Sequence, residues 1–295
     1  MRRILTTLTA ALVALGSAYA QDAALTAMDF AARPADAKSL GMGMTSAFHS
    51  VAARVQEDCK LDAAAFYLPW KNAGGSSLGF GADVYARLGK GLGLNVNFLM
   101  DNGKKIDNYT GPGSSSGTFK PSSMVVGGGL SYKIIPALSI GASVRYLNDK
   151  LTDRAKYSAI GADVMLSGSF SGFSYAAGVT NLGSKVKGTG NEAWPIPAAA
   201  TLAGKYTLEK DIHRVEAALQ ADWFFKGGFR AGAGAAYTFK DMVSARLGYS
   251  YGGKSVLPSC FTVGAGVKFK GFTLDGAFLI GDVTGTFMVA LGYRF

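Results

Sequence analysis

Side chains that commonly carry catalysis or bind metals are scarce in this chain of 295 residues. It contains two histidines, His49 and His213, and two cysteines, Cys59 and Cys260. Neither histidine belongs to a recognisable serine–histidine–acid or paired-carboxylate arrangement, and these four side chains lack the close spacing of metal ligands. We therefore expect no catalytic site, no metal and no cofactor, and we interpret the protein as a non-enzyme.

Charged side chains form a clearer pattern, because thirteen of them recur in runs that alternate between apolar and polar residues. A charge that faces lipid near the middle of a bilayer costs a barrel about 2–4 kcal/mol. The thirteen charges all fall on the face opposite the apolar one, which predicts that they face a lumen: Asp83, Arg87, Lys133, Arg145, Asp163, Lys205, Glu216, Asp222, Arg230, Arg246, Lys268, Asp275 and Arg294.

The signs of these luminal charges are mixed, eight basic and five acidic. Mixed signs favour internal ion pairs that brace a plugged barrel over a charge-selective pore, which is the alternative. Asp83 with Arg87, and Glu216 or Asp222 with neighbouring arginines, are the expected members of this network.

The elements that must position these charges are short strands. Fourteen alternating runs extend from about Leu61 to Phe295, and an even number returns the C-terminus to the side where the first strand begins. The long connections Gly103–Ser122 and Asn181–Pro197 fall on one side, and short turns fall on the other, around Lys90, Pro136, Phe170, Lys210, Lys240 and Lys270. The sequence predicts an all-β, transmembrane antiparallel barrel of about 14 strands. A soluble β-sandwich also alternates, but its solvent face would be rich in Lys, Glu and Thr, whereas this polar face is mainly Gly, Ala and Ser.

The first 60 residues do not alternate. Arg2 and Arg3, an apolar run from Ile4 to Leu15 and the Ala18-Tyr19-Ala20 sequence predict a cleaved signal peptide over residues 1–20. An uncleaved anchor is the alternative, although the run is shorter than the roughly 20 residues that a membrane helix needs. Residues 21–60 predict a plug or hatch segment, residues 61–295 the barrel, and the outer membrane is the expected location.

Export suggests a structural role for the two cysteines. An oxidising compartment allows a disulfide between Cys59 and Cys260 that would tie the N-terminal segment to the barrel. The alternative is two separate thiols, because sequence contains no information on the distance between them. We expect the disulfide.

The last strand reads TGTFMVALGYRF and ends on Tyr293, Arg294 and Phe295. It resembles the C-terminal insertion signal of outer-membrane barrels, with Ala290 where that pattern usually has glycine. The resemblance implies the barrel-insertion machinery as a partner. The alternative is an ordinary aromatic edge strand.

The net charge of +10 does not indicate nucleic-acid binding, because the lysines occur singly at turns rather than in a patch with exposed aromatic residues. Contact with outer-membrane lipid and lipopolysaccharide phosphates is the better prediction, and solubility of the loops is the alternative. The side chains expected to make this contact lie in the long connections: Lys104, Lys105, Lys120, Lys150, Arg154, Lys185 and Lys187.

Two short motifs carry a family resemblance. Gly41, Met42 and Gly43 lie within SLGMGMTSAF, ahead of LPWKNAG, and this order is similar to the opening of FadL-like outer-membrane barrels, although Met44 and Thr45 replace the usual Gly-Ala. Asn181, Leu182 and Gly183 resemble the Asn-Leu-Gly loop of the PorV/PorQ branch.

The resemblance implies fourteen strands, an N-terminal hatch and one of two functions. As a PorV/PorQ-like protein, the chain would be a binding, shuttle or scaffold barrel of type IX secretion, with secretion-system or cargo proteins as partners. As a FadL-like protein, it would be an uptake channel for hydrophobic or small solutes.

Overall fold

The computed structural model of the protein describes residues 26–57, 59–72, 75–89, 91–111, 114–152, 155–187, 193–226, 228–252, 259–281 and 286–295. The predicted signal peptide lies outside this part of the chain. Within it, no helix is long and apolar enough to cross a membrane.

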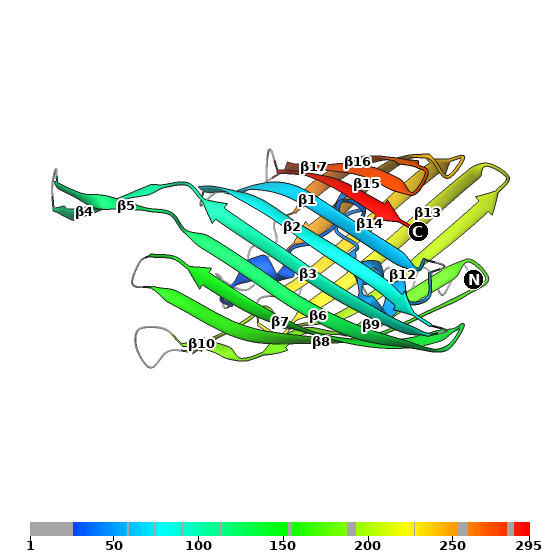
Figure 1. The fold of residues 1–295 in the computed structure, drawn as a ribbon, viewed down its shortest axis with the longest axis horizontal. Helices are drawn as coiled ribbons and strands as arrows, with labels where there is room; N and C mark the ends of the chain where they lie inside the picture. Colours follow the sequence, from blue (N-terminus) through cyan, green and yellow to red (C-terminus); the bar gives the residue numbers. More distant parts are fainter. Residues whose placement is uncertain are drawn as a thin grey trace.

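Fourteen antiparallel strands close into a barrel in which β1 pairs with β18, as predicted from the alternating runs (Figure 1). The strands of the wall are β1 (Leu61–Asn72), β2 (Gly75–Leu88), β3 (Leu92–Gly103), β6 (Ser122–Ile135), β7 (Leu138–Lys150), β8 (Lys156–Phe170), β9 (Phe173–Gly183), β12 (Ala199–Lys210), β13 (His213–Phe224), β14 (Gly228–Phe239), β15 (Val243–Gly252), β16 (Cys260–Phe269), β17 (Phe272–Gly281) and β18 (Phe287–Arg294).

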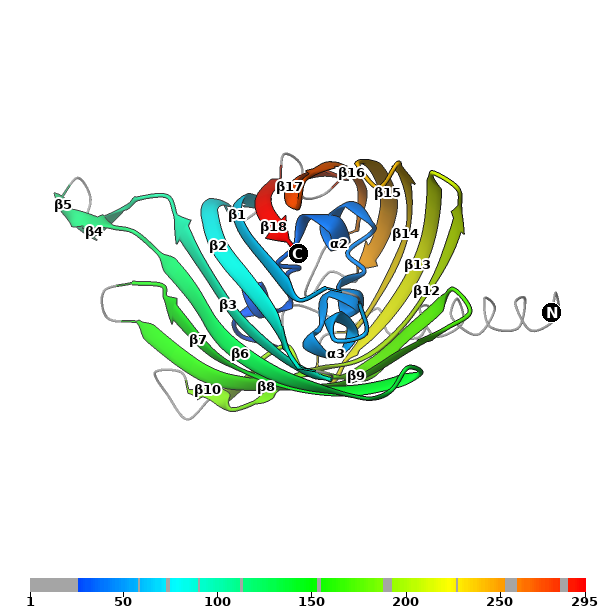
Figure 2. The same cartoon turned by 45° about the vertical axis from the view of Figure 1, so that its right-hand side comes forward.

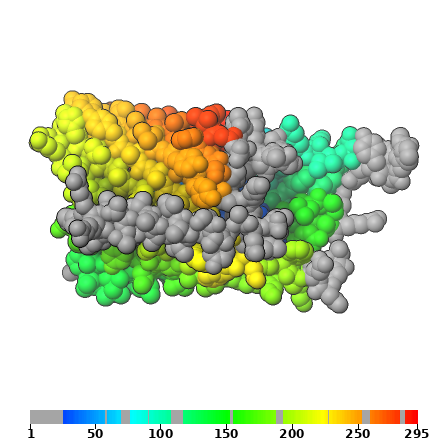
Figure 3. All heavy atoms as spheres, turned by 180° about the vertical axis from the view of Figure 1, so that it is seen from behind, coloured from blue at the N-terminus to red at the C-terminus, as the bar shows by residue number. Residues whose placement is uncertain are grey.

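The two ends of the barrel differ. Six short turns and the C-terminus gather at one end, which we call the short-turn end. The opposite, long-loop end carries two extra hairpins, β4 (Ile106–Gly111) with β5 (Ser114–Phe119), and β10 (Lys185–Lys187) with β11 (Ala193–Pro195). The β4–β5 hairpin projects well beyond the wall (Figures 1 and 3). Short turns on one side and longer loops on the other are typical of outer-membrane barrels.

The outer surface of the wall is apolar. On β18, for example, Phe287, Val289 and Leu291 are exposed, whereas Met288 and Ala290 between them are buried. The thirteen charges predicted to face the lumen all occupy positions that are buried or half-buried. This alternation places apolar side chains where lipid would lie, because a charge there would be costly.

Residues 26–57, which we call the plug, lie inside the barrel (Figure 2). The plug contains two short α-helices, α2 (Ala37–Gly41) and α3 (Val51–Arg54), and two 3₁₀ helices, η1 (Asp29–Ala32) and η2 (Ser46–His49). Asp36 begins α2 by accepting a hydrogen bond from the Ser39 amide at 2.7 Å, which satisfies a donor that the first helical turn leaves without a partner. Helix α2 packs against β15 to β18, and α3 against β3 and β6 to β8.

Glycines in the wall allow the plug backbone to approach closely. A Cβ at Gly234 would lie 2.4 Å from the Met42 carbonyl oxygen, and one at Gly248 would lie 2.2 Å from the Gly43 nitrogen. Gly43 itself has a φ of +69°, a conformation that favours glycine. The Gly41-Met42-Gly43 motif and the small inward residues of β14 and β15 therefore form one backbone-to-backbone contact.

Asn181 of the second motif forms a β-bulge. Two residues of β9, Thr180 and Asn181, lie opposite Asp163 alone on β8. Asn181 has a φ of +55°, its amide donates to Asp163 Oδ1 at 2.7 Å, and its side-chain oxygen accepts from Arg145 at 2.6 Å. A bulge bends its strand and leaves the ladder locally unpaired. The Asn-Leu-Gly sequence thus has a structural explanation in this chain.

The predicted disulfide between Cys59 and Cys260 is wrong. Cys59 lies at the short-turn end, where its thiol donates to the carbonyl oxygens of Leu61 at 3.1 Å and Phe295 at 3.5 Å. Cys260 begins β16 at the long-loop end, opposite Ser250 and Gly281. A strand of this length spans roughly 30 Å, whereas a disulfide needs Cα atoms within about 7 Å.

Candidate functional site

The lumen is the candidate site, and its two halves differ in chemistry. Toward the long-loop end, plug side chains pack with inward wall side chains into what we call the apolar layer. The plug contributes Met28, Phe30, Leu40 and Met44, all at most 6% exposed. The wall contributes large apolar side chains from β1, β3, β6, β7, β17 and β18: Phe66, Leu68, Leu99, Val125, Leu147, Leu279 and Met288.

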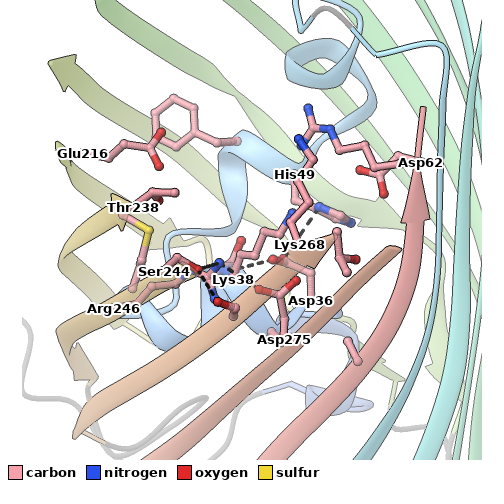
Figure 4. A pocket seen from close by; sticks show the side chains of 18 of the residues that line it. Asp36, Lys38, His49, Asp62, Glu216, Thr238, Ser244, Arg246, Lys268 and Asp275 are labelled. Atoms are coloured by element: carbon pink, nitrogen blue, oxygen red, sulfur yellow. Dashed lines mark hydrogen bonds and ion pairs between the residues drawn. The ribbon is translucent and has the colours of Figure 1, made fainter. Parts of the chain in front are cut away.

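Toward the short-turn end, the plug and the wall enclose a cavity of about 680 Å³. We call it the charged cavity, because both acidic and basic side chains line it (Figure 4). The plug contributes Asp36, Lys38 and His49, and the remaining wall lies along β1, β2 and β12 to β18. Helix α3 packs on the other side of the lumen, against β3 and β6 to β8.

The structure brings eight of the thirteen predicted luminal charges together in pairs. Arg145 lies 2.8 Å from Asp163, and Lys205 lies 3.5 Å from Glu216. Arg230 lies 2.6 Å from Asp222, and Arg246 lies 2.8 Å from Asp275. In three pairs the two side chains come from adjacent strands, whereas Arg246 of β15 and Asp275 of β17 meet over Gly266 of the strand between them. Alternation places the charges on one face, and strand register sets the partner.

Four other predicted charges contact groups outside the predicted set. Asp83 pairs with Arg54 of the plug and not with Arg87, which donates to the Glu57 carbonyl oxygen at 3.2 Å. Arg294 pairs with the Glu57 carboxylate, and Lys268 lies 2.7 Å from Asp241 in the turn after β14. The remaining charge, Lys133, forms no ion pair with any part of the chain that the structure describes.

The residues that sequence reasoning missed are the charges of the plug. Arg33 pairs with Asp101 at 2.8 Å, and Arg54 approaches both Asp83 and Asp62. The stretch AARPADAKSLGMGMTSAFHSVAARVQEDC contains both arginines without periodicity. A buried charge needs a counter-charge, so their presence in a segment predicted to enter a lumen was the available signal.

A second plug anchor uses a buried pair in the wall. Gln220 accepts from the Ala47 amide at 2.9 Å and donates to both Asp222 oxygens at 3.0 Å. Asp222 also binds Arg230, and the two charged side chains are 5% and 6% exposed. The plug backbone is thus connected through one amide side chain to an ion pair that water scarcely reaches.

His49 lines the charged cavity. Its Nδ1 lies 3.9 Å from Asp36 and its Nε2 lies 3.5 Å from Asp83. Burial alone would lower the pKa of His49, but the two carboxylates outweigh burial and the nearby Arg54, so the pKa lies above its ordinary value. At Glu57, burial is outweighed by Arg294 and other cations, which hold the pKa of the carboxyl below its usual range.

The arrangement pairs acidic with basic side chains around the cavity. His213 lies at the short-turn end, where Nδ1 contacts the Tyr237 hydroxyl at 2.7 Å. No group of three or more His, Cys, Asp or Glu side chains in the part of the chain that the structure describes could hold a metal.

Comparison with known proteins supports the fold. No protein-family model and no curated protein matches the sequence. The structure is similar to the P. putida toluene transporter TodX (TM-score 0.59, 13% identity, 89% of this chain and 98% of that one). It is also similar to the CymD monoaromatic hydrocarbon channel (0.56, 11%, 88% and 97%) and to a Pseudomonas aeruginosa FadL homologue (0.53, 10%, 88% and 98%).

These neighbours agree with the FadL-like barrel implied by the sequence resemblance. At 10–13% identity the likeness shows the fold alone. Nothing in the comparisons supports the PorV/PorQ branch or a role in type IX secretion. Two of the three neighbours are named as a transporter or a channel, and none is named as an enzyme.

Proposed function

We propose that the protein is an outer-membrane uptake channel for small hydrophobic solutes, with the plug as its gate. The short-turn end would then face the periplasm and the long-loop end the exterior, as in other outer-membrane barrels. TodX and CymD, named for toluene and monoaromatic hydrocarbons, support this class of solute.

The observation that carries the proposal is the apolar layer. The interior of a water-filled barrel is polar, yet Leu68, Leu147, Leu279 and Met288 face this lumen at 0–2% exposure. An apolar solute that arrives from the long-loop end would meet apolar walls wherever the plug withdrew. Burial of its surface there is favourable by roughly 25 cal/mol per Å².

The plug has the features of a gate. It is held by apolar packing, by Gln220 and by a few ion pairs with the wall, and it has no long helix of its own. Plug side chains occupy the apolar layer, so a solute must displace them to enter. Uptake should therefore depend on movement of residues 26–57 relative to the wall.

Toluene uptake tests the proposal. In a strain that lacks the gene, the wild-type protein should restore uptake of radiolabelled toluene without changing the uptake of glucose, a polar solute. Identical toluene uptake with and without the protein would overturn the proposal. Fractionation with the outer membrane and a heat-dependent gel shift would establish that the barrel is present.

A plug-locking variant tests the gate. Gly41 and Gly264 are in backbone contact, since a Cβ on either residue would lie 3.2–3.3 Å from the other's Cα. Gly41→Cys with Gly264→Cys, in a chain whose Cys59 and Cys260 are replaced by alanine, should close a disulfide after a small shift. Oxidation should abolish toluene uptake and reduction should restore it, whereas either single cysteine should behave identically under both conditions.

The secretion scaffold is the second candidate, and the projecting β4–β5 hairpin is the observation that favours it, because an exposed hairpin offers strand edges to another protein. Crosslinking and pulldown from outer membranes would recover secretion-system or cargo proteins if this function held. If no such partner is recovered and the protein does restore toluene uptake, the scaffold function is rejected and the channel function remains.

A further inference from the structure

Under the plug, the wall has a flat patch that consists of glycine backbone. Gly232 and Gly234 lie two residues apart on β14 and face the lumen, and Gly234 lies directly opposite Gly248 of β15. The plug backbone at Met42 and Gly43 lies against all three glycines, where a Cβ on any of them would clash with it. We call Gly232, Gly234 and Gly248 the glycine patch. Because the patch has no side chains, a flat group can lie directly on it.

Polar side chains border the glycine patch on both sides. Gln220 of β13 lies opposite Gly232, and Gly232 lies opposite Ser250 of β15. Thr262 of β16 lies opposite Gly248. All three polar side chains belong to residues that are at most 5% exposed. Strand register therefore places one amide and two hydroxyl groups around a floor of glycine.

The plug backbone uses two of these three polar groups. The Gly43 amide donates to Thr262 Oγ1 at 2.9 Å, and the Ala47 amide donates to Gln220 Oε1 at 2.9 Å. Both wall groups therefore act as acceptors while the plug is in place. When the plug withdraws, both lose their partner, and leaving a buried acceptor unpaired is unfavourable. An occupant that donates a hydrogen bond would replace the plug backbone at this position.

Ser250 is the polar group that the plug does not use. It is 0% exposed, and its Oγ has no hydrogen-bond partner among the residues that the structure describes. A buried hydroxyl without a partner destabilises a fold, and alanine would occupy the same space without that cost. Stability of the closed state therefore does not explain a serine at this position. A ligand that accepts a hydrogen bond from Ser250 does explain it.

The chemistry of the site defines the ligand. The flat floor favours a planar ring, and Leu279, which lies opposite Thr262 and belongs to the apolar layer, favours an apolar one. The border needs a group that donates to Thr262 and accepts from Ser250. These two residues are diagonal neighbours on adjacent strands, with Cα atoms about 7–8 Å apart, so one hydroxyl group can reach both. A phenol combines such a ring with such a hydroxyl, whereas toluene has no polar group.

We propose that the glycine patch and its polar border form a binding site for hydroxylated monoaromatic solutes, that is, phenols, when the plug withdraws. The ring would lie on the glycines, and the hydroxyl would bond to Ser250 and Thr262. This inference rests on the proposed function, in which the plug is a gate, and adds a preference for phenols over plain hydrocarbons. It also makes the plug backbone and the solute competitors, because both need Thr262.

Parallel uptake of p-cresol and toluene tests this site. Both radiolabelled solutes would be given to the strain that lacks the gene, carrying the wild type or Ser250→Ala, and uptake without the protein subtracted. Ser250→Ala should raise the p-cresol concentration for half-maximal uptake by about three- to tenfold, the range for one lost hydrogen bond. The value for toluene should not change, because Ser250 makes no hydrogen bond to the plug within the described chain.

The matched control is Ser131→Ala. Ser131 is 3% exposed, and its Oγ also has no hydrogen-bond partner among the described residues, but it lies on β6, across the barrel from β15. This variant should take up p-cresol as the wild type does, and a heat-dependent gel shift confirms that both variants are folded. Unchanged p-cresol uptake in Ser250→Ala, or an equal loss in both variants, would overturn the inference. Failure of the wild type to restore uptake of either solute would instead reject the channel.

Competition with the plug provides a second readout. In lipid vesicles, p-cresol should increase protease access to residues 26–57 more than toluene does at the same concentration, because only p-cresol can replace the Gly43 amide at Thr262. Ser250→Ala should reduce this difference, and Ser131→Ala should preserve it. Equal protease access with p-cresol and toluene in the wild type would contradict a shared site.

Discussion

The two halves of the lumen hold the plug by different physical means. In the apolar layer, Phe30, Leu40 and Met44 interlock with wall side chains of matching shape. In the charged cavity, ion pairs connect the plug to the wall around an open volume. Packing loses energy whenever a side chain shifts, whereas charges tolerate displacement if another partner or water is near. The apolar layer should therefore determine the position of the plug. The charged cavity should determine how strongly the plug is held at different pH and salt concentrations.

Removing one partner of the buried wall pair should have the largest effect. Asp222→Ala leaves Arg230 buried without its counter-charge and removes the group that orients Gln220, the plug anchor. We expect a loss of about 3–5 kcal/mol in the free energy of unfolding, measured by urea titration of tryptophan fluorescence in lipid vesicles. The double variant Asp222→Leu with Arg230→Met removes both buried charges of this pair. It should therefore recover most of the lost free energy of unfolding. An equally unstable double variant would contradict the explanation.

Shortening a side chain in the apolar layer should come next. Leu40 is 0% exposed, so Leu40→Ala creates a cavity, at a cost of about 2–5 kcal/mol. We expect greater protease access to residues 26–57 and a higher ion conductance in planar bilayers. Leu202→Ala is the control, because Leu202 is 62% exposed on the outside of the barrel. If both variants leave the plug equally protected, packing does not position it.

Raising the pH should loosen the plug by a smaller amount. The pKa of His49 is raised in the folded state, so protonation stabilises the plug fully below the ordinary histidine pKa near 6.5. That stability is lost as the pH rises through the folded pKa. We expect protease access to the plug to increase as the pH rises above about 6.5, with His49→Gln abolishing the dependence. An unchanged pH profile in His49→Gln would assign the effect to another group.

Removing an exposed pair at the rim of the charged cavity should have the smallest effect. Lys268 and Asp241 are 40% and 53% exposed, and such pairs contribute about 0.2–1 kcal/mol. Lys268→Gln should change the free energy of unfolding by no more than this, and less in high salt. A loss comparable to that of Asp222→Ala would mean that the rim holds the barrel as firmly as its interior.

Prediction from sequence succeeded where a strict period applied. Alternation at Asp83, Arg230 and Asp275 identifies the inward face whatever the partners are, because successive side chains of a strand point to opposite faces. The fourteen strands and the positions of the short turns followed from the same pattern. Prediction was less complete in the plug, whose short helices and 3₁₀ turns have no period, and so it missed Arg54 and Glu57.

The sequence by itself therefore determined the barrel, its two different ends and the sidedness of every strand, because each of these depends on residue type at a local spacing. Only the tertiary structure decided the partners. Register placed Asp222 against Arg230 and Lys150 against Lys156, and closure of the barrel set Cys59 and Cys260 at opposite ends. The path of the plug over Gly234 and Gly248 also arose at this level, since contacts between distant segments depend on the folded chain and not on local spacing.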